Sequence, residues 1–504
     1  MKKTLLIFIG VILVGSAAMK SVAQAVPQNL DNYYQELSLS HEMNGNVAAS
    51  QNGKTIYQRS FGFKDIAAQK KNDKNTQFEL ASVTKLFTAT AVLQLKERGL
   101  INLDAPFQYY FPEFPYAKIT IRHLLSHTSG LPDIETFVDS LIAKYPEKQF
   151  TIRDDPQNVI AYSRNHVLTA QPGEKWMYSS AGYHLLALLV EKISGQTMAA
   201  YVRDYIFQPA RMIHSYVQTS MKQKEDPDRT KNYQYRNHIA FQLQWVDTVK
   251  NLKEWSYNLA LETGGGGIIS TTSDMLRFDA ALNAGKLLKP KTLEEAYAPY
   301  ILNNGKPAQL FDLTYCCLGW FVFKDTSHGR VVWGSGSNPG KISFFARNID
   351  RHQCLVVLHN IKSNSFNDIN AVNILNGQKL TYHIPLAFVY AQDLYKKGQG
   401  YADEHFKTLL HDTAKYVLTE SDLNNAAVEM RRMGKKEALM ICELDVQTFP
   451  QSADAYATYG FTLNRFGQKE KSIIAYKKAI ELNPGDQESK DALKKLMGDQ
   501  LKTN

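Results

Sequence analysis

Residues 79–85 read ELASVTK, and an apolar segment follows them directly and ends at Gly99. Glycine after such a segment is typical of a helix C-terminus, so the pattern predicts a helix over Val83–Arg98. A serine and a lysine one helical turn apart share a face, which brings Lys85 beside Ser82. A lysine in that place can serve as the base that activates a serine hydroxyl. The alternative is that Ser82 is only a helix N-cap, because the Ser-x-x-Lys spacing also arises by chance.

Predicted strand pairs enclose this helical stretch. Residues Val47–Asp65 have the pattern of two strands around an Asn-Gly hairpin turn at 52–53. A second strand pair is predicted at Ile342–Ala346 and Cys354–Leu358, and another helix is predicted over Ala181–Ser194. Strands at both ends of a helical middle predict an α+β domain whose ends meet in one antiparallel sheet.

Three further segments resemble motifs of one enzyme family, in the order in which that family uses them. They are ITIRHLLSHTSGLP at 119–132, PGE at 172–174 with YSSAGY at 178–183, and GSGSNPG at 334–340. With the Ser-x-x-Lys pair, the set resembles the class C β-lactamase-like serine hydrolases of the β-lactamase and penicillin-binding-protein superfamily, a group that includes esterases and D-amino-acid peptidases. The resemblance covers roughly residues 30–375 and implies an antiparallel sheet with a helical subdomain.

The resemblance implies a mechanism by way of an acyl-enzyme. Ser82 would be the nucleophile, and Lys85 and Tyr178 would share the general-base and general-acid work. A phenol beside a buried ammonium gives up its proton more easily, which suits that division. The backbone N–H groups of Ser82 and Ser337 would form the oxyanion hole. The alternative for Tyr178 is an ordinary, partly buried aromatic residue ahead of a helix.

Two positions depart from the family's pattern. The second motif usually has asparagine where this chain has Ser180, and the third usually begins with lysine or histidine where an ungapped alignment places Gly334. A shifted alignment would put Trp333 there, as in some related esterases. The loss of an amide and a cation removes two groups that hold an anionic or amide-bearing substrate, so efficient β-lactam hydrolysis is not expected and an ester or peptide-like substrate is favoured. The resemblance still implies substrate contacts by Ser180, Gly334, Ser335 and Gly336.

Two other features have a functional and a structural interpretation. His127 is a candidate catalytic base, but the equivalent loop histidine of the resembled family is architectural, which we expect here too. Gly264–Gly267 is similar to a phosphate-binding loop, but no Gly-Lys-Ser/Thr follows it. The segment resembles the family's glycine-rich turn into a helix, where Thr271 and Asp274 are predicted to form a capping box.

The composition is that of a soluble globular protein. The chain has 504 residues, of which 44% are hydrophobic and 21% are charged, enough for two or three domains. The net charge is +9, and three lysines within the first 25 residues, where there is no acid, leave +6 for the remainder. No long run of lysine or arginine follows, so nucleic-acid binding is not expected.

The first residues have the pattern of an export signal. A basic start leads into the apolar run Leu5–Gly15, and the sequence Ala-Gln-Ala at 23–25 fits a cleavage site. The run is short for a membrane span, so an uncleaved anchor is the weaker alternative. We therefore expect a signal peptide over 1–25 and a mature protein that is periplasmic or extracellular, without stable membrane insertion.

The cysteines and histidines do not follow metal-site or disulfide patterns. Cys316 and Cys317 are adjacent, and Cys354 and Cys442 lie in distant apolar or helical segments. This is not the spacing of a disulfide framework, so we expect small buried residues. The 13 histidines lack zinc-binding spacings, and neither a metal nor another cofactor is expected.

From Glu420 onward a pattern recurs with a period of about 34 residues, which predicts helix pairs. The residues that match a tetratricopeptide repeat are Tyr456, Tyr459, Gly460, Leu463, Gly467, Tyr476, Ala479 and Pro484. One period earlier, the first helix (Leu423–Met433) matches poorly. Two repeats are few for an array, so we expect them to dock on the main domain or pair with another copy. The predicted organisation is a signal peptide over 1–25, a hydrolase-like domain over 26–378, a connector over 379–418 and repeats over 419–504.

Two functions are compatible with these patterns. The first is an exported serine hydrolase acting on an ester, amide or peptide-like substrate, with the helical tail binding a partner or another copy. The second is a catalytically weak protein that binds cell-wall-like or peptide ligands as a scaffold. The presence of Ser82, Lys85 and Tyr178 favours the enzyme, whereas Ser180 and Gly334 leave the scaffold open.

Overall fold

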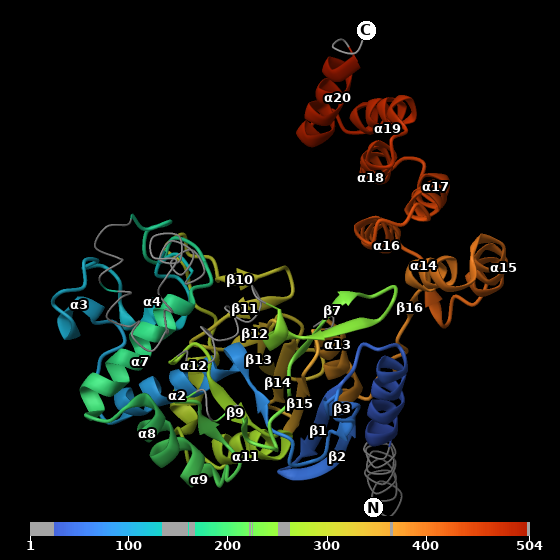
Figure 1. The fold of residues 1–504 in the computed structure, drawn as a ribbon. Coiled ribbons are helices and arrows are strands. Elements are labelled where there is room, and N and C mark those ends of the chain that lie inside the picture. Colours follow the sequence, from blue (N-terminus) through green and yellow to red (C-terminus); the bar gives the residue numbers. More distant parts are fainter. Residues whose placement is uncertain are drawn as a thin grey trace, which may run out of the picture. The chain divides into compact units, whose positions relative to one another are not determined.

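The computed structural model describes residues 25–133, 160, 167–220, 223, 225–249, 263–362 and 366–500. The predicted signal peptide, except for its last residue, lies outside the described residues. The chain forms two compact units (Figure 1). The first comprises Met1–Gln234 and Gln244–Leu380, and the second comprises Tyr235–Leu243 and Thr381–Asn504.

The first unit is built on one eight-stranded sheet in which every neighbouring pair of strands is antiparallel. The first strand, β1, pairs with the last, β15, so the two ends of the unit meet in the sheet and the predicted α+β class is confirmed. The turn at 52–53 has positive φ at both residues, as a two-residue hairpin requires. In sheet order the strands are β10 (Gln309–Leu310), β11 (Thr314–Cys316), β12 (Phe321–Phe323), β13 (Val331–Asn338), β14 (Lys341–Asn348), β15 (Gln353–His359), β1 (Gly45–Gln51) and β2 (Lys54–Phe61).

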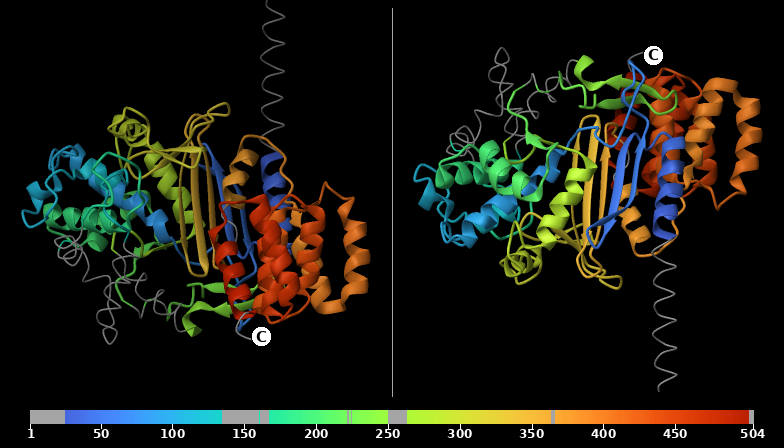
Figure 2. Two further views of the ribbon diagram at one scale, coloured as in Figure 1. Left: turned by 90° about the horizontal axis from the view of Figure 1, so that it is seen from above. Right: turned by 90° about the horizontal axis from the view of Figure 1, so that it is seen from below.

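Helices cover both faces of this sheet (Figures 1 and 2). On one face α11 packs on β1 and β15, and α2 and α7 pack against each other beside it. On the other face lie α13 and a helix over residues 25–39, where Tyr34 Oη donates to Asp368 Oδ1 at 3.3 Å. Both predicted helices are present, and positive φ at Gly99 and Gly195 marks their ends. The bounds are α2 (Thr84–Glu97), α7 (Ser180–Ser194), α11 (Thr272–Asn283) and α13 (Phe366–Leu375).

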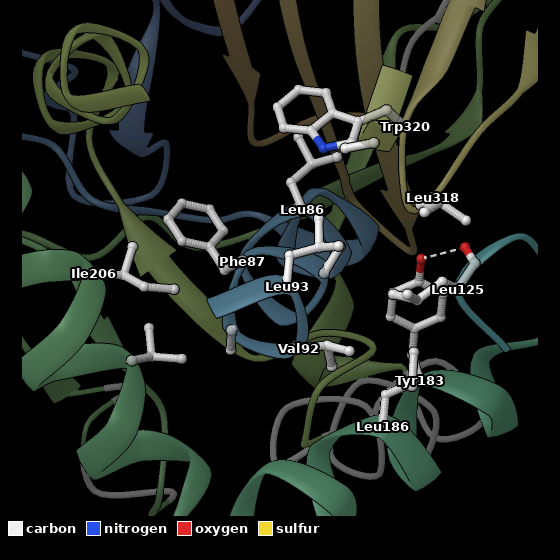
Figure 3. Close-up of a cluster of buried hydrophobic side chains, with 14 of the residues drawn as sticks. Leu86, Phe87, Val92, Leu93, Leu125, Tyr183, Leu186, Ile206, Leu318 and Trp320 are labelled. Carbon is white, nitrogen blue, oxygen red and sulfur yellow. Dashed lines mark hydrogen bonds between the residues drawn. The ribbon is translucent and has the colours of Figure 1, made fainter. Parts of the chain in front are cut away.

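Helix α2 is the centre of the core. Its residues 84–95 are all buried, which is expected of a helix that is surrounded by other elements. Leu86 and Phe87 lie on this helix among side chains of α7 and of the segment that carries Trp320 (Figure 3). Tyr183 of α7 donates its hydroxyl proton to the carbonyl oxygen of Leu125 at 2.8 Å. The helix that carries Lys85 is therefore held from all sides.

A three-stranded sheet in the order β5-β9-β6 aligns two segments beside the start of α2. Strand β5 (Phe78–Glu79) leads into Ser82, and β9 (Ile268–Ser270) follows the glycine segment 264–267. Their antiparallel pairing brings the glycine segment to α2, where Thr88 Oγ1 donates to the carbonyl of Gly264 at 2.7 Å. The other short elements are β3 (Phe63–Asp65), β4 (Lys70–Lys71), α3 (Phe107–Tyr110), α4 (Ile121–Leu125), α8 (Met198–Val202), η3 (Arg203–Phe207), α9 (Gln208–Ala210), β6 (Tyr216–Val217), β7 (Tyr233–Asn237), β8 (Gln242–Trp245), η5 (Val246–Thr248) and α12 (Pro290–Tyr297).

The predicted capping box of α11 is only half formed. Thr271 Oγ1 accepts from the backbone N–H of Asp274 at 3.1 Å, as predicted. The Asp274 carboxylate instead accepts from the backbone N–H of His214 at 2.7 Å and from Ser215 Oγ at 2.8 Å. In a complete capping box the Asp274 carboxylate would accept from the backbone N–H of Thr271. Here it binds residues 214 and 215 instead, a tertiary contact that the local sequence does not encode.

A buried ion pair joins β14 to the helices on its face. Arg347 Nε donates to Asp279 Oδ1 at 2.6 Å, and both side chains are almost fully buried. The guanidinium also donates to Asn283 Oδ1 at 2.7 Å and to the hydroxyl of Tyr297. Because removal of one partner of a buried pair leaves an uncompensated charge, this pair is costly to break singly.

The second unit is helical apart from short strands and a hairpin tip. Its helices pack in succession, and Leu423, Ala427 and Met430 of α16 lie in its core with Ile239 of the segment Tyr235–Leu243. The interval predicted as a connector contains α14 and α15. The tetratricopeptide assignment and the domain limits remain predictions. The elements are β16 (Ile384–Pro385), α14 (Leu386–Lys397), α15 (Gln399–Leu410), β17 (Tyr416–Val417), α16 (Glu420–Arg432), α17 (Ala438–Thr448), α18 (Ala453–Arg465), α19 (Lys469–Leu482) and α20 (Gln487–Gln500).

All four cysteines are free and buried, which agrees with the prediction of small buried residues. Burial raises the pKa of the thiols of Cys316 and Cys442 to about 12, so both are protonated near neutral pH. Within the described ranges, no helix combines the length and the apolar character that a membrane span needs.

Candidate active site

Ser82 lies in a tight turn between β5 and α2. The turn is a 3-10 helix over Ala81–Val83, and α2 begins at Thr84 with Val83 as its N-cap. No side chain caps either helix start, so the interpretation of Ser82 as an N-cap is wrong. Ala81 has φ +45°, a left-handed conformation that is uncommon outside glycine. The turn therefore leaves the Ser82 hydroxyl available for contacts across the site.

Three side chains that are far apart in the sequence meet at that hydroxyl. Lys85 Nζ lies 3.1 Å from Ser82 Oγ, and Tyr178 Oη lies 2.7 Å from the same oxygen. Lys85 is only 4% exposed and also donates to the carbonyl of Gly265 at 2.9 Å. The predicted convergence of hydroxyl, ammonium and phenol is therefore present, with both partners within hydrogen-bonding distance of the serine oxygen.

The position of Tyr178 follows from the start of α7. Ser179 is the N-cap of that helix, and its hydroxyl accepts from the backbone N–H of Gly182 at 3.3 Å. The same hydroxyl donates to the carbonyl of Pro132 at 3.1 Å, which ties the helix start to the end of the segment 119–132. The ring of His127 stacks on the ring of Tyr178 with centroids 4.5 Å apart. The phenol is thus oriented by a cap and a stacked ring.

His127 is a neutral support rather than a base. Its Nδ1 accepts from the backbone N–H of Ser179 at 3.2 Å, which requires that nitrogen to be unprotonated. Burial, and next the charge of Lys85, lower the pKa of His127 to about 3. A neutral imidazole with that pKa does not take up a proton near neutral pH, in agreement with the architectural role expected of it.

The third motif strand lies against the backbone of the nucleophile. A methyl group at Gly336 would lie 2.5 Å from the carbonyl oxygen of Leu80 and 2.7 Å from the amide nitrogen of Ser82. Ser343 on the neighbouring strand donates to the same Leu80 carbonyl at 2.5 Å. Because Ser337 follows Gly336 directly, the two amides predicted for an oxyanion hole belong to adjoining stretches of backbone.

The remaining predicted substrate contacts have less uniform surroundings. Ser180 is buried, and its backbone N–H donates to Asp133 Oδ1 at 2.9 Å. Gly334 faces Leu86, whose methyl carbons would lie 3.1 Å from an added Cβ, so an apolar side chain occupies the space next to the missing cation. Ser335 is half-buried on the opposite face of the strand.

The shifted alignment is not supported by the sheet. Trp333 precedes Gly334 on β13, so its side chain points to the other face. There it packs against the rings of Phe321, Phe323 and Phe344, with centroids between 4.9 and 5.8 Å away. The tryptophan therefore does not take the place of the missing lysine or histidine.

Two groups at the site were not singled out from the sequence. The sequence predicts the glycine segment only as a turn into a helix, but the carbonyl of Gly265 accepts from Lys85 Nζ. Gly264 has φ +89°, and an added Cβ would lie 2.5 Å from the carbonyl oxygen of Tyr183, so the segment approaches α7 as closely as backbone allows. The second group is the buried carboxylate of Glu79, three residues before the nucleophile. The run of four glycines was a signal for close backbone approach.

The hydroxyl of Ser82 contacts a buried ammonium and a phenol, and the amides of Ser82 and Ser337 belong to adjoining stretches of backbone. This set of groups is typical of the active site of a serine hydrolase. The family described as Beta-lactamase matches residues 30–379, and the chain belongs to this family of serine hydrolases. The match spans the sheet, the helices that cover it and all of the motif segments.

Individual relatives agree with that assignment. A penicillin-binding protein of Bacillus subtilis (strain 168) is 33% identical over 337 residues, which are 66% of this chain and 71% of that protein. Protein flp of Staphylococcus aureus (strain COL) is 27% identical over 338 residues, 65% of this chain and 61% of its own length. The solved D-amino acid amidase of Ochrobactrum anthropi SV3 is similar over 71% of this chain and 97% of that one, at 25% identity and a TM-score of 0.54. A penicillin binding protein of Bacillus halodurans shares the fold, with 24% identity and a TM-score of 0.57 over 68% of this chain and 99% of that one.

Substitution Gly336→Ala is expected to slow reaction of Ser82 with a fluorophosphonate by about 100-fold or more, the scale of losing one oxyanion-hole donor. The added methyl meets backbone atoms on the Ser82 turn, and no rotamer change can relieve such a contact. Gly334→Ala is the matched control, because the three atoms nearest to its methyl all belong to the flexible side chain of Leu86 and not to backbone. Equal labelling rates for wild type and Gly336→Ala would contradict the close approach.

The free energy of unfolding is expected to fall as pH drops from 6.5 toward 3. In that window unfolded His127 binds a proton that the folded site excludes, so stability decreases with acidity, by up to about 1.4 kcal/mol per pH unit from this group. His127→Asn keeps an acceptor for the Ser179 N–H but does not titrate. Urea unfolding at pH 7, 6, 5 and 4 should therefore give a shallower decline for the variant, and parallel declines would refute the assignment.

Proposed function

We propose that this protein is an exported serine hydrolase that acts through an acyl-enzyme on Ser82. The observation that carries the proposal is the contact of Ser82 Oγ with both Lys85 Nζ and Tyr178 Oη, at 3.1 and 2.7 Å. A hydroxyl used only for structure has no need of a buried ammonium and a phenol on the same oxygen. The export part rests on the signal-like sequence of residues 1–25 and places the protein in the periplasm or outside the cell.

In the proposed reaction, the Lys85–Tyr178 pair has first given up one proton. Ser82 Oγ then attacks the substrate carbonyl carbon while its proton passes to the pair, and the amides of Ser82 and Ser337 stabilise the oxyanion. The leaving group departs with a proton from the pair and leaves an ester on Ser82. Water attacks that ester and gives a proton to the same pair. As the bond between Ser82 Oγ and the acyl carbon breaks, the pair returns that proton to Ser82 Oγ, which releases the acid and the free serine.

The site favours an ester, amide or peptide-like substrate without a carboxylate that must be bound by the third motif. Gly334 supplies no cation, and Leu86 occupies the space into which a side chain at position 334 would extend. Among the described residues, β13 pairs with β12 only at Val332 and Trp333, so its segment from Gly334 to Ser337 has one free edge. An extended acyl group can add to such an edge through backbone hydrogen bonds. The names of the relatives, a penicillin-binding protein and a D-amino acid amidase, are compatible with this class.

The second candidate is a weakly catalytic scaffold that binds cell-wall or peptide ligands. It is favoured by Ser180 and Gly334, which lack the amide and the cation of the usual motifs. A ligand could still bind along the free edge of β13 beside Ser82. The two candidates differ in turnover, so one labelling experiment separates them.

The helical tail is proposed to bind a peptide or a second copy of the chain through an aromatic and cationic patch. Phe461 on α18 is 53% exposed, and the guanidinium of Arg431 on α16 lies 4.3 Å from its ring centroid. Arg431 is held in place because it also donates to Thr462 Oγ1 at 2.9 Å. A large exposed ring with a fixed cation is typical of a residue that carries binding energy.

Ser82→Ala is expected to abolish both fluorophosphonate labelling and turnover across a panel of p-nitrophenyl esters and amino-acid amides. Lys85→Met and Tyr178→Phe should each lower kcat/KM by about 100-fold or more, because each removes a proton-transfer partner. Retained labelling in Ser82→Ala would identify another nucleophile. A wild-type protein with neither label nor turnover, yet with saturable binding of peptidoglycan fragments, would establish the scaffold instead.

Phe461→Ser is expected to weaken self-association, measured by sedimentation equilibrium, or binding to an immobilised peptide library, by tenfold or more. Ile474→Ser is the matched control, because Ile474 is also an exposed apolar residue of the repeats, at 68%, but lies on α19. An equal loss in both variants, or no loss in either, would count against the patch.

A further inference from the structure

A cluster of three buried charges lies directly behind the nucleophile turn. Lys341 Nζ is 2.6 Å from Glu79 Oε1, with side chains 2% and 1% exposed. Arg229 Nη2 is 3.7 Å from Glu79 Oε2, and that guanidinium is only 4% exposed. Arg229 is itself oriented, because its Nη1 donates to Gln218 Oε1 at 2.6 Å. The family motifs account for none of these contacts.

The Glu79–Lys341 pair spans the two chain segments that would form the oxyanion hole. Glu79 lies on β5, three residues before Ser82. Lys341 begins β14 and is paired with Asn338, the residue after Ser337. The ion pair therefore crosses from the strand that leads to one predicted amide donor to the hairpin that carries the other.

Two neighbouring contacts join the same hairpin to the turn that carries Ser82. Ser343, two residues along β14 from Lys341, donates to the carbonyl of Leu80 at 2.5 Å. Gly336 on β13 leaves no room for a side chain against Leu80 and Ser82. Since residues 341 and 343 share a face of the strand, the hairpin holds the nucleophile turn by two adjacent side-chain contacts.

Stability alone is a poor explanation for such a cluster. Desolvation of buried ions cancels most of their attraction, and apolar residues of similar size often hold strands together as well or better. What a buried ion pair with a short contact adds is a defined separation between the groups that it joins. The groups joined here carry the atoms whose separation controls catalysis.

We propose that Lys341 and Glu79 are positioning residues that set the separation of the Ser82 and Ser337 amides, with Arg229 orienting the carboxylate. The proposal rests on the proposed function. Neither residue touches the reacting atoms. Their loss would displace donors that act in the transition state, so kcat falls while KM, which reflects ground-state binding, stays nearly constant.

The test compares Lys341→Met with Arg347→Met in the full-length protein. Arg347→Met is the matched control, because it breaks another buried ion pair on the same strand, six residues away. Both are assayed with p-nitrophenyl esters at a temperature where circular dichroism shows them folded. The expected result is a tenfold or greater loss of kcat in Lys341→Met with KM within about threefold, and no such split in Arg347→Met. Lys341→Arg should recover part of the loss.

A second variant guards against simple misfolding. Glu79→Gln combined with Lys341→Met and Arg229→Gln removes all three buried charges, so this triple variant leaves no uncompensated charge and is expected to fold while keeping the kcat defect. An unchanged kcat in either the single or the triple variant, or the same loss in Arg347→Met, would overturn the proposal.

Amide hydrogen exchange separates this proposal from the proposed function. Segments 79–85 and 334–340 should exchange about tenfold faster in Lys341→Met than in Arg347→Met, because the ion pair holds them together. If the wild type shows no Ser82-dependent label or turnover, the proposed function fails while the exchange result still decides the positioning role. Equal exchange in the two variants would refute it.

Discussion

The approach of β13 to the backbone of Ser82 is the constraint on which the site depends. The amide nitrogen of Ser82 and the carbonyl of Leu80 leave no space for a Cβ at position 336. Only a strand that is fixed in a sheet can keep such a separation, and β13 is fixed by eight paired residues on β14. The large antiparallel sheet therefore acts as the frame of the site, and the glycine of the third motif is required by close packing rather than by a turn.

The reactive groups are held by neutral contacts and by backbone. Lys85 binds the carbonyl of Gly265, and Tyr178 is held by the cap of α7 and the stacked ring of His127. Burial keeps His127 neutral, so a second positive charge is not placed beside the Lys85 ammonium. A charged imidazole there would compete with the proton transfers proposed for the lysine and the phenol. Under the proposed function, the histidine supports the reaction by staying uncharged.

The departures from the family's motifs alter the surroundings of the site and leave its reactive centre intact. The serine, lysine and phenol keep mutual contact, while Leu86 lies against Gly334. Under the proposed function, the groups that would make and break an acyl bond are in contact, whereas the groups that would hold an anionic substrate are absent from Ser180 and Gly334. The second unit is not formed by the C-terminal residues alone, because Ile239, from the turn between β7 and β8, is part of its core.

The sequence by itself determined the fold class, the pairing of the unit's ends and the residues that meet at Ser82. The fold class and the pairing of the ends follow from strand and helix periods and turn residues, and the contact of Lys85 with Ser82 follows from their helical spacing. The place of Tyr178 was implied by the resemblance of the ordered motif segments to a known family. Only the tertiary structure decided that Ser82 is not a cap, that Trp333 faces away from the site, and that Asp274 leaves its capping box for another partner. It also decided that Glu79 is paired with Lys341, 262 residues along the chain. Such facts depend on contacts between distant residues, and neither spacing nor composition carries information about which side chains share a buried space.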